Sequence, residues 1–140
     1  MTTVDFKAYN SQKAFMSDHP TIGHGKICYL EIPAGDVDAS ANFYKAVFNW
    51  NVRTRGDGSA AFDDGVCEVS GTWIAGRSPQ TDPVVIMHIM VDDMDASIEK
   101  VKANGGTIVE PVGAHLPEIT AKFSDPHGNV FSMYQHGGRK

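Results

Sequence analysis

The chain has 140 residues, of which 41% are hydrophobic and 21% charged, and its formal net charge is −5. This size and composition are typical of one compact globular domain. The acidic balance argues against nucleic-acid binding, and no apolar run approaches the roughly 18 residues that a membrane span requires. Residues 1–24 lack the apolar segment of a signal peptide, so we expect a cytoplasmic protein.

In chain order, residues 1–25 show no periodicity and are predicted to form an N-terminal arm. Alternating and helical patterns then predict, in a first unit (26–76), a helix at 36–48 and strands at 26–33, 50–54, 60–62 and 66–74. After a turn-rich connector at 76–83, a second unit (84–136) has a predicted helix at 93–104 and strands at 84–91, 107–110, 119–123 and 130–135.

The two units are copies of one pattern. Asp36-Val-Asp-Ala-Ser40 recurs as Asp93-Met-Asp-Ala-Ser97, an offset of 93 − 36 = 57 residues. The apolar positions that follow are spaced by four, three and four residues in both copies, as on one helix face, and each leading Asp suits a helix N-cap. The sequence therefore predicts an α+β fold in one domain (26–137), with two tandem βαβββ units forming a curved mixed sheet around a cleft and helices outside.

Alternation along the strands assigns side chains to two faces of the sheet. Cys28, Leu30 and Ile32 are expected under the helix, and Cys67 is expected to be another small buried hydrophobe. The opposite face is expected to line the cleft and to carry Tyr29, Glu31, Ile86, His88, Ser132 and Tyr134.

Several phrases of the sequence are shared with a known family. They are Tyr29-Leu-Glu-Ile-Pro33, Asp36-x-x-x-Ser40-x-x-Phe43-Tyr44-x-x-Val47-Phe48-x-Trp50, Val91-Asp-Asp93, Gly105-Gly106 and Asp125-Pro-x-Gly-Asn129. In order and spacing they resemble the vicinal oxygen chelate superfamily, which includes glyoxalase I, bleomycin-resistance proteins, fosfomycin-inactivating enzymes and extradiol dioxygenases. The resemblance covers about residues 26–135 and implies the fold more specifically than the function.

The resemblance also implies where a divalent metal would be held. Metal-using members place His or Glu on the first and last strands of each unit, and these positions correspond here to Tyr29, Ile86 and Ser132, with Trp73 or Glu68 as candidates for the fourth. Ile86 cannot bind a metal, and Tyr29 and Ser132 are poor ligands for a labile divalent ion. The usual metal site is therefore expected to be degenerate, so no metal ligand is assigned and the cofactor is left open.

Glu31 and His88 occupy equivalent positions in the two units, two residues beyond Tyr29 and Ile86. They are the predicted catalytic residues, either as an acid–base pair or as the start of a shifted metal site, with Glu118 or Glu68 as further ligands. A structural polar pair is the simpler alternative. The predicted substrate-binding residues are Tyr29, Trp73, Glu118, Ser132 and Tyr134.

Three functions follow from the resemblance. The first is a protein that binds or transforms a small organic metabolite or toxin in the cleft without a typical metal site. The others are a metal-dependent lyase or isomerase of the glyoxalase I type with ligands shifted to Glu31 and His88, and a metal-free protein that sequesters its ligand. Whether the chain is an enzyme is left open. Because relatives are commonly dimers, the resemblance implies a homodimer, with the arm as a segment that crosses to the partner.

Overall fold

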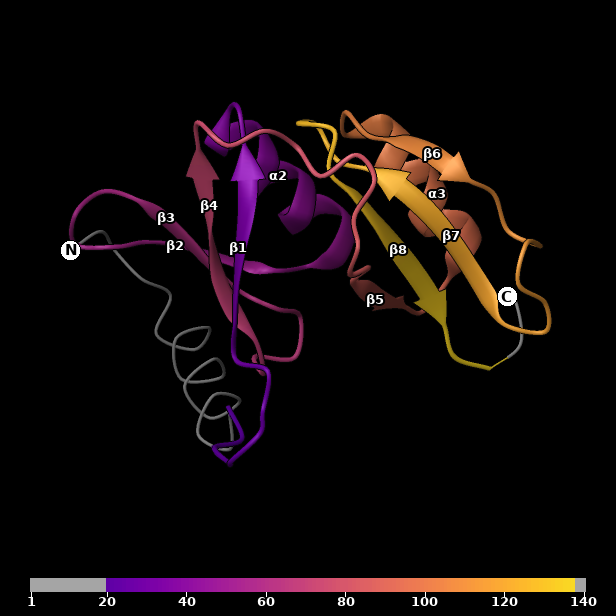
Figure 1. Ribbon diagram of the computed structural model, residues 1–140, viewed down its shortest axis with the longest axis horizontal. Helices are drawn as coiled ribbons and strands as arrows, with labels where there is room; N and C mark the ends of the chain where they lie inside the picture. Colours follow the sequence, from indigo (N-terminus) through magenta and orange to yellow (C-terminus); the bar gives the residue numbers. More distant parts are fainter. Residues whose placement is uncertain (1–19, 138–140) are drawn as a thin grey trace, which may run out of the picture.

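The computed structural model describes residues 20–137, so most of the predicted arm lies outside the described residues (Figure 1). Each unit has the predicted order β-α-β-β-β. The first consists of β1 (Tyr29–Ala34), α2 (Val37–Phe48), β2 (Asn51–Thr54), β3 (Ala60–Asp63) and β4 (Ser70–Ala75). The second consists of β5 (His88–Val91), α3 (Met94–Ala103), β6 (Thr107–Glu110), β7 (Ile119–Ser124) and β8 (Val130–Gln135).

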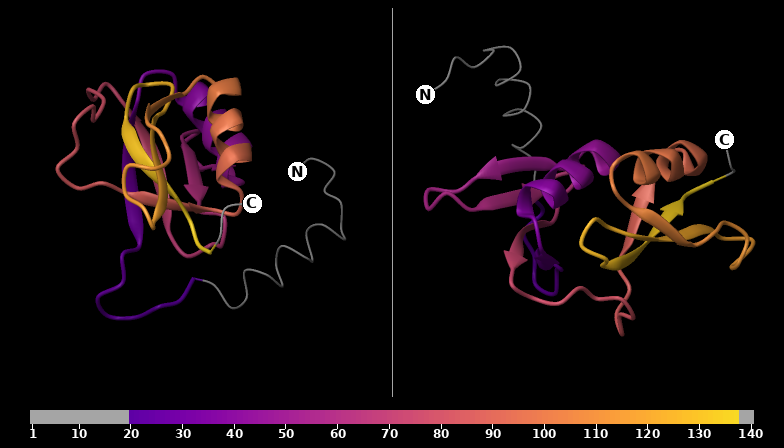
Figure 2. Two further views of the ribbon diagram at one scale, coloured as in Figure 1. Left: turned by 90° about the vertical axis from the view of Figure 1, so that its right-hand side faces the viewer. Right: turned by 90° about the horizontal axis from the view of Figure 1, so that it is seen from above.

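The strands form two four-stranded sheets, ordered β1-β4-β3-β2 and β5-β8-β7-β6. In each sheet the first and last strands of the unit pair in parallel and the others antiparallel. Both helices lie on the same side of the sheets (Figure 2). The predicted α+β class with helices outside is therefore confirmed. The two mixed sheets carry their helices on the same side. Within residues 20–137, no helix is long and apolar enough to cross a bilayer.

The predicted helix signals act as expected. Asp36 and Asp93 are the N-caps of α2 and α3, and the Oδ1 of each accepts a hydrogen bond from a backbone N–H three residues later, at 3.1 Å in both cases. Such caps satisfy one of the free N–H groups of the first turn. Asn49 ends α2 in the left-handed conformation, with φ of 58°. The repeat seen in the sequence is thus a repeat of helix starts.

Three predicted strands are shorter than expected. β1 begins at Tyr29 and leaves Cys28 exposed, so the prediction of a buried Cys28 was wrong. Residues 64–69 form a turn in which Cys67 has φ of 59°, so β4 begins at Ser70 rather than at residue 66. β5 begins at His88, because Val84 and Val85 have no neighbouring strand and are exposed. In each case β-propensity without a pairing partner does not make a strand.

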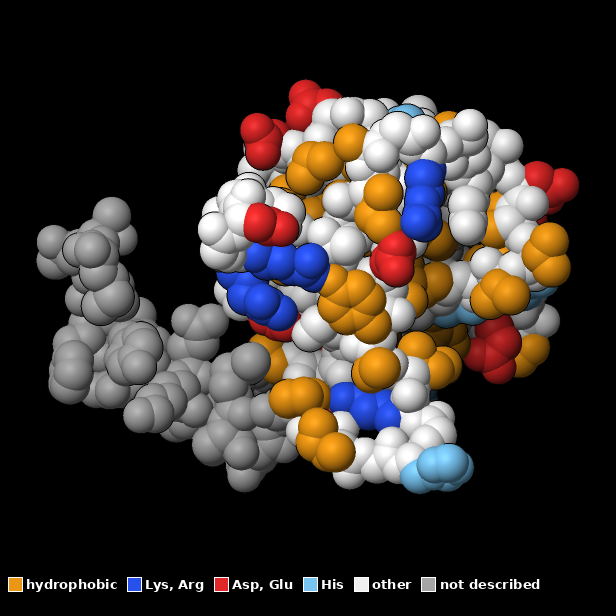
Figure 3. Space-filling view, turned by 60° about the vertical axis from the view of Figure 1, so that its left-hand side comes forward, with side chains coloured by type: hydrophobic (Ala, Val, Ile, Leu, Met, Phe, Trp, Pro, Cys, Tyr) orange, Lys and Arg blue, Asp and Glu red, His pale blue; other side chains and the backbone are white. Residues whose placement is uncertain are grey.

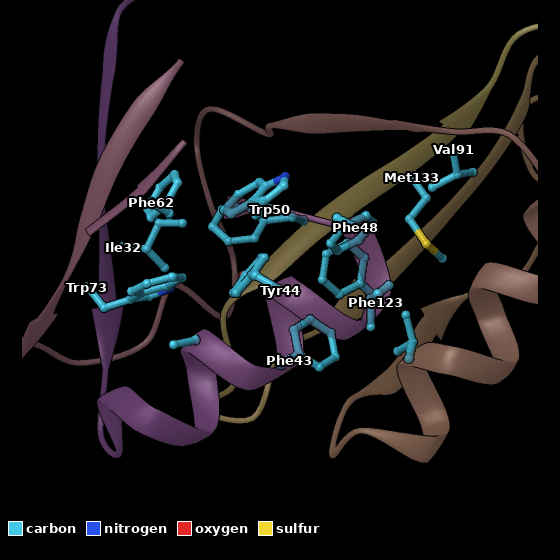
Figure 4. Close-up of a cluster of buried hydrophobic side chains, with 14 of the residues drawn as sticks. Ile32, Phe43, Tyr44, Phe48, Trp50, Phe62, Trp73, Val91, Phe123 and Met133 are labelled. Atoms are coloured by element: carbon cyan, nitrogen blue, oxygen red, sulfur yellow. The ribbon is translucent and has the colours of Figure 1, made fainter. Parts of the chain in front are cut away.

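One hydrophobic core runs through both units, between the helices and the sheets (Figure 4). Trp50 stacks between Tyr44 and Phe62, with ring centroids 4.6 and 4.5 Å from theirs, and so packs where α2 is followed by β2. Phe43 of α2 contacts Phe123 of β7, with centroids 5.9 Å apart, which joins the first unit to the second. Burying an aromatic side chain of this kind stabilises the fold by about 1.5–3 kcal/mol.

A buried hydrogen-bond network also joins the two units. Its central group is the carboxylate of Asp125, a residue that is 3% exposed. Its Oδ1 accepts from the backbone N–H groups of His127, Gly128 and Asn129, each at 3.0 Å. Its Oδ2 accepts from Tyr44 Oη of the first unit and from Asn129 Nδ2, both at 2.8 Å. Five hydrogen bonds compensate a buried charge that would otherwise be very costly.

We expect Asp125→Ala to lower the free energy of unfolding by about 3–5 kcal/mol, because it leaves several buried donors without an acceptor. Urea denaturation followed by circular dichroism measures the loss. Asp82→Ala, at an exposed position of the connector, is the matched control and should change stability by less than about 0.5 kcal/mol. Equal losses in the two variants would contradict the role assigned to Asp125.

Burial, and secondarily the charge and hydrogen bond of Asp125, raise the pKa of Tyr44 well above its ordinary value. Because the folded-state pKa lies above the unfolded-state value of about 10, the stabilisation is complete below pH 10 and is lost as the pH rises beyond it. The expected loss is at most roughly 1.4 kcal/mol per pH unit, measured by urea denaturation between pH 9 and 11. Tyr44→Phe should flatten this decline, whereas Tyr134→Phe should leave it as steep as in the wild type.

Candidate functional site

Each sheet has one face turned away from its helix, which we call its open face. Strand alternation places Tyr29 and Glu31 of β1 on the open face of the first sheet, opposite Ser70 and Thr72 of β4. In the second sheet, His88 and Met90 of β5 lie opposite Ser132 and Tyr134 of β8. The faces predicted for Tyr29, Glu31, His88, Ser132 and Tyr134 agree with this register, whereas Ile86 precedes β5 and lies in no strand, which corrects its predicted place on the sheet. β1 and β5 are edge strands at the boundary between the two units, which we call the seam (Figure 1).

Tyr29 and Glu31 have partners within their own unit. Tyr29 is 45% exposed; its hydroxyl accepts a hydrogen bond from Arg55 Nη2, and the Arg55 guanidinium carbon lies 5.8 Å from the centre of its ring. The carboxylate of Glu31 forms an ion pair with Arg77, at 3.4 Å between Oε2 and Nη2. Both ion-pair partners are exposed enough that the pair itself contributes little stability.

The expected pairing of Glu31 with His88 is not present. Within residues 20–137, no hydrogen bond or ion pair joins the two side chains, and the partner of Glu31 is Arg77. His88 is exposed and lies directly across the ladder from Ser132, whose side chain is 1% exposed. The two residues are equivalent in sequence, but each belongs to a separate sheet, and equivalence in a repeat does not by itself bring side chains into contact.

The remaining predicted site residues are scattered. Trp73 is 5% exposed and packs on Phe62 in the core, on the helix side of the first sheet, so it lies away from the open face. Tyr134 is half-buried on the open face of the second sheet, and its hydroxyl lies 3.4 Å from His136 Nδ1. Glu118 is exposed in the loop before β7, where its backbone N–H donates to the carbonyl of His115. The structure does not bring these three residues together.

The strand register identifies the fourth position of the family's metal site. Glu31 and His88 correspond across the repeat, since 88 − 31 = 57. Glu31 lies opposite Thr72, and His88 lies opposite Ser132. Thr72 is therefore the equivalent of Ser132, and neither Trp73 nor Glu68 occupies that place. The Thr72 hydroxyl donates to the carbonyl of Ala60 at 2.7 Å.

These residues do not fit a divalent metal. Tyr29, Thr72, Ile86 and Ser132 supply three neutral hydroxyl groups and an alkyl chain, whereas such ions prefer imidazole, thiolate or carboxylate ligands. Among residues 20–137, no group of three or more His, Cys, Asp or Glu side chains is placed to hold a metal ion. A metal site shifted to Glu31 and His88 would need both side chains to reach the same ion. Glu31 and His88 lie on separate sheets, and the partner of Glu31 is Arg77.

A polar network on the open face of the first sheet was not predicted. Asp63 of β3 accepts hydrogen bonds from Nε and Nη2 of Arg53, each at 3.0 Å. It also accepts from Ser70 Oγ at 2.7 Å and from Asn51 Nδ2 at 3.2 Å. Burial alone would raise the pKa of Asp63, but these hydrogen bonds and the charge of Arg53 outweigh it and hold the pKa below its usual value. The sequence contained a sign of this polar face, because every second residue of the strand is polar on one side: Asn51, Arg53 and Arg55.

Two cavities lie where the units meet. One of about 200 Å³ lies at the seam, where β1 faces the connector and β8, and its lining includes Leu30, Glu31, Val85, Met87 and Phe131. The other, of about 340 Å³, lies between the end of α2 and the start of α3 and contains none of the predicted site residues. The seam cavity therefore combines apolar walls with one predicted catalytic carboxylate, as small-molecule sites commonly do.

Comparison with known proteins gives consistent results. A protein of Didymella fabae described as "Glyoxylase-like domain-containing protein" is 30% identical over 131 residues, covering 83% of this chain and 98% of the relative. Similar solved structures include hypothetical protein SA1046 of S. aureus, with a TM-score of 0.65 and 21% identity over 81% of this chain and 95% of that one. The fosfomycin resistance protein FosX of Listeria monocytogenes, solved with Mn(II) and 1S,2S-dihydroxypropylphosphonic acid, has a TM-score of 0.64 and 16% identity over 81% of this chain and 90% of that one.

The profile of one protein family matches residues 26–133, which is most of the chain. This range begins just before β1 and ends within β8, so it spans both βαβββ units. The chain belongs to the Glyoxalase/Bleomycin resistance protein/Dioxygenase superfamily.

Proposed function

We propose that this chain binds a small organic molecule on the open faces next to the seam, and that it does so without a divalent metal. The observation that carries the proposal is the set of residues at the four metal positions of the family. Tyr29 and Thr72 carry hydroxyl groups at these positions, Ser132 carries a hydroxyl that is buried, and Ile86 has an apolar side chain. Hydroxyl groups donate and accept hydrogen bonds, which suits them to the polar groups of an organic ligand better than to a metal ion.

The surroundings support this proposal. The seam cavity places Glu31 among apolar side chains such as Leu30 and Phe131, so a ligand there would meet both hydrophobic contact and one charged group. Its volume of about 200 Å³ suits a small molecule or one end of a larger molecule. FosX was solved with a metal ion and a phosphonic acid, and the present chain would bind its ligand through side chains alone.

Glu31 and His88 are the proposed acid–base groups if the bound molecule is transformed. Glu31 pairs with Arg77, and His88 is exposed on the neighbouring sheet; carboxylate and imidazole side chains are the usual acid–base groups of enzymes. Because these groups lie on separate sheets, they would act on different parts of a ligand that spans the seam. Without turnover, the same residues would serve a protein that sequesters its ligand.

We expect the purified full-length protein to contain less than stoichiometric Zn²⁺, Ni²⁺ or Mn²⁺ and to melt at the same temperature with and without a chelator. A ligand that binds only the folded state raises its stability, so an unchanged melting temperature on adding metal indicates that no specific site is filled. Elemental analysis and thermal denaturation provide the two measurements. Stoichiometric metal that is lost in His88→Ala, but kept in the loop variant His115→Ala, would contradict the proposal.

We also propose that the protein is a homodimer whose contact includes the open faces. Large apolar side chains remain exposed there and at the connector, including Met90, which is 66% exposed, and Val85. Exposed apolar groups that belong to one continuous surface commonly mark an interface, and burying them against a second copy would enclose the ligand site.

Light scattering of the full chain should therefore give twice the chain mass of 15.2 kDa at micromolar concentration. Met90→Lys places a charge in the proposed contact and should raise the dimer dissociation constant about tenfold or more. Lys102→Glu on α3 changes the charge on the helix side and should leave the mass unchanged. A monomer in the wild type would exclude the proposed dimer.

A further inference from the structure

Arg55 has an unusual environment for an arginine. It follows β2 and is only partly exposed, because its side chain lies over the open face of the first sheet. Among the residues that the structure describes, no carboxylate lies within ion-pair distance of its guanidinium group. A guanidinium group that has lost part of its hydration without gaining an anion carries an uncompensated cost.

The neighbouring cations on this side of the molecule are already neutralised. Arg53 is bound by both oxygens of Asp63, and Arg77 pairs with Glu31. Asp57 follows Arg55 closely, but its carboxylate accepts from the side chain and backbone of Ser59; these hydrogen bonds are the main reason for its lowered pKa, and the charge of Arg55 adds a smaller part. Figure 3 shows Lys and Arg side chains (blue) close to hydrophobic ones (orange) on this side of the molecule.

Arg55 reaches Tyr29 across the width of the sheet. β1 and β2 are the two outer strands, about three strand spacings or roughly 14 Å apart. The register places Tyr29 level with Ser70, Asp63 and Asn51, so Arg55, which follows the last residue of β2, approaches Tyr29 diagonally. The two long side chains meet through the hydrogen bond and the cation–π contact.

This contact leaves hydrogen-bond donors without acceptors. Arg55 has five N–H groups in a planar fork, and only Nη2 is engaged by a side chain. The Tyr29 hydroxyl accepts from Arg55, which leaves its own proton to donate. No side-chain acceptor for that proton lies within reach among residues 20–137. A charged fork and a hydroxyl donor thus lie side by side on a partly exposed surface.

We propose that Arg55 and Tyr29 form an anchoring site for an oxyanion, so that the small organic ligand carries a carboxylate or phosphate group. The guanidinium fork matches two oxygens of such a group, and the Tyr29 hydroxyl supplies a third donor. The ring of Tyr29 adds an apolar surface for the part of the ligand next to the anion. This inference rests on the proposed function, since it names the ligand class of the same open face. The anion would occupy the β1–β2 side of the first sheet, leaving Glu31 and the seam cavity for the rest of the molecule.

The test uses the full-length protein, prepared with chelator, and three probes: benzoate, inorganic phosphate and benzamide, the neutral counterpart of benzoate. Titrations are followed by two-dimensional ¹H–¹⁵N NMR, including the side-chain Nε resonance of Arg55. Benzoate should cause saturable shifts at that resonance and at backbone amides near residues 29 and 55. Benzamide should bind about tenfold more weakly or worse, because it lacks the charge that strengthens the hydrogen bonds. Phosphate binding with the same footprint would show that the oxyanion alone suffices.

Substitutions distinguish this site from general attraction by positive charge. Arg55→Gln should weaken benzoate about tenfold or more, and Arg55→Lys should weaken it less, because the charge remains while the fork is lost. Tyr29→Phe should weaken it by a few-fold through loss of one donor. Lys102→Gln removes the same charge on α3 and should leave binding within about twofold. The NMR spectrum itself reports whether each variant is folded. If Arg55→Gln does not fold, Arg55→Lys still tests the site.

Two results would overturn the inference: equal weakening by Arg55→Gln and Lys102→Gln, or equal binding of benzoate and benzamide. Either result would leave a metal-free binding function intact. Conversely, Arg55-dependent benzoate binding in a protein that also retains stoichiometric zinc would support the anchoring site and contradict the proposed metal-free function. The two proposals can therefore fail separately.

Discussion

The hydrogen bond between Tyr44 of α2 and Asp125 of the β7–β8 turn joins the two units at a point that water does not reach. Asp125 also binds the backbone of its own turn and the side chain of Asn129, which in turn donates to the carbonyl of Pro33 at the end of β1. A buried carboxylate needs these hydrogen bonds, because each lost partner leaves more of the free-energy cost of burying its charge uncompensated. The relative placement of the units is therefore fixed by polar geometry as well as by the aromatic core.

This placement decides which surfaces remain available for function. Because α2 and α3 lie on the same side, their apolar faces merge into one core, and the open faces of both sheets turn toward the other side (Figure 2). His127 of the same turn packs against Gly35, and its Nε2–H donates a hydrogen bond to the carbonyl of Arg77 at 2.9 Å, so the turn also holds the connector.

On the open face, charge is balanced inside the first sheet with one exception. Asp63 neutralises Arg53 and Glu31 neutralises Arg77, whereas the Arg55 guanidinium contacts the neutral hydroxyl of Tyr29 and forms no ion pair within residues 20–137. Tyr29 is also one of the positions at which metal-using members of the superfamily would carry a ligand. In the site that we propose, a tyrosine hydroxyl next to an arginine stands in place of a metal ligand, so the oxygen atoms of a ligand would be bound through hydrogen bonds.

The sequence by itself determined the two helix starts, the order of elements in each unit and the faces of β1, β5 and β8, because caps and periodicity depend on residues close together in the chain. It also indicated that Ile86 cannot bind a metal and that Ser132 is a poor ligand for one. Only the tertiary structure decided that Trp73 belongs to the core, that Glu31 and His88 do not meet, and that Arg55 reaches Tyr29 across the sheet. These contacts depend on strand order, register and the packing of one unit on the other, which no local pattern in the sequence records.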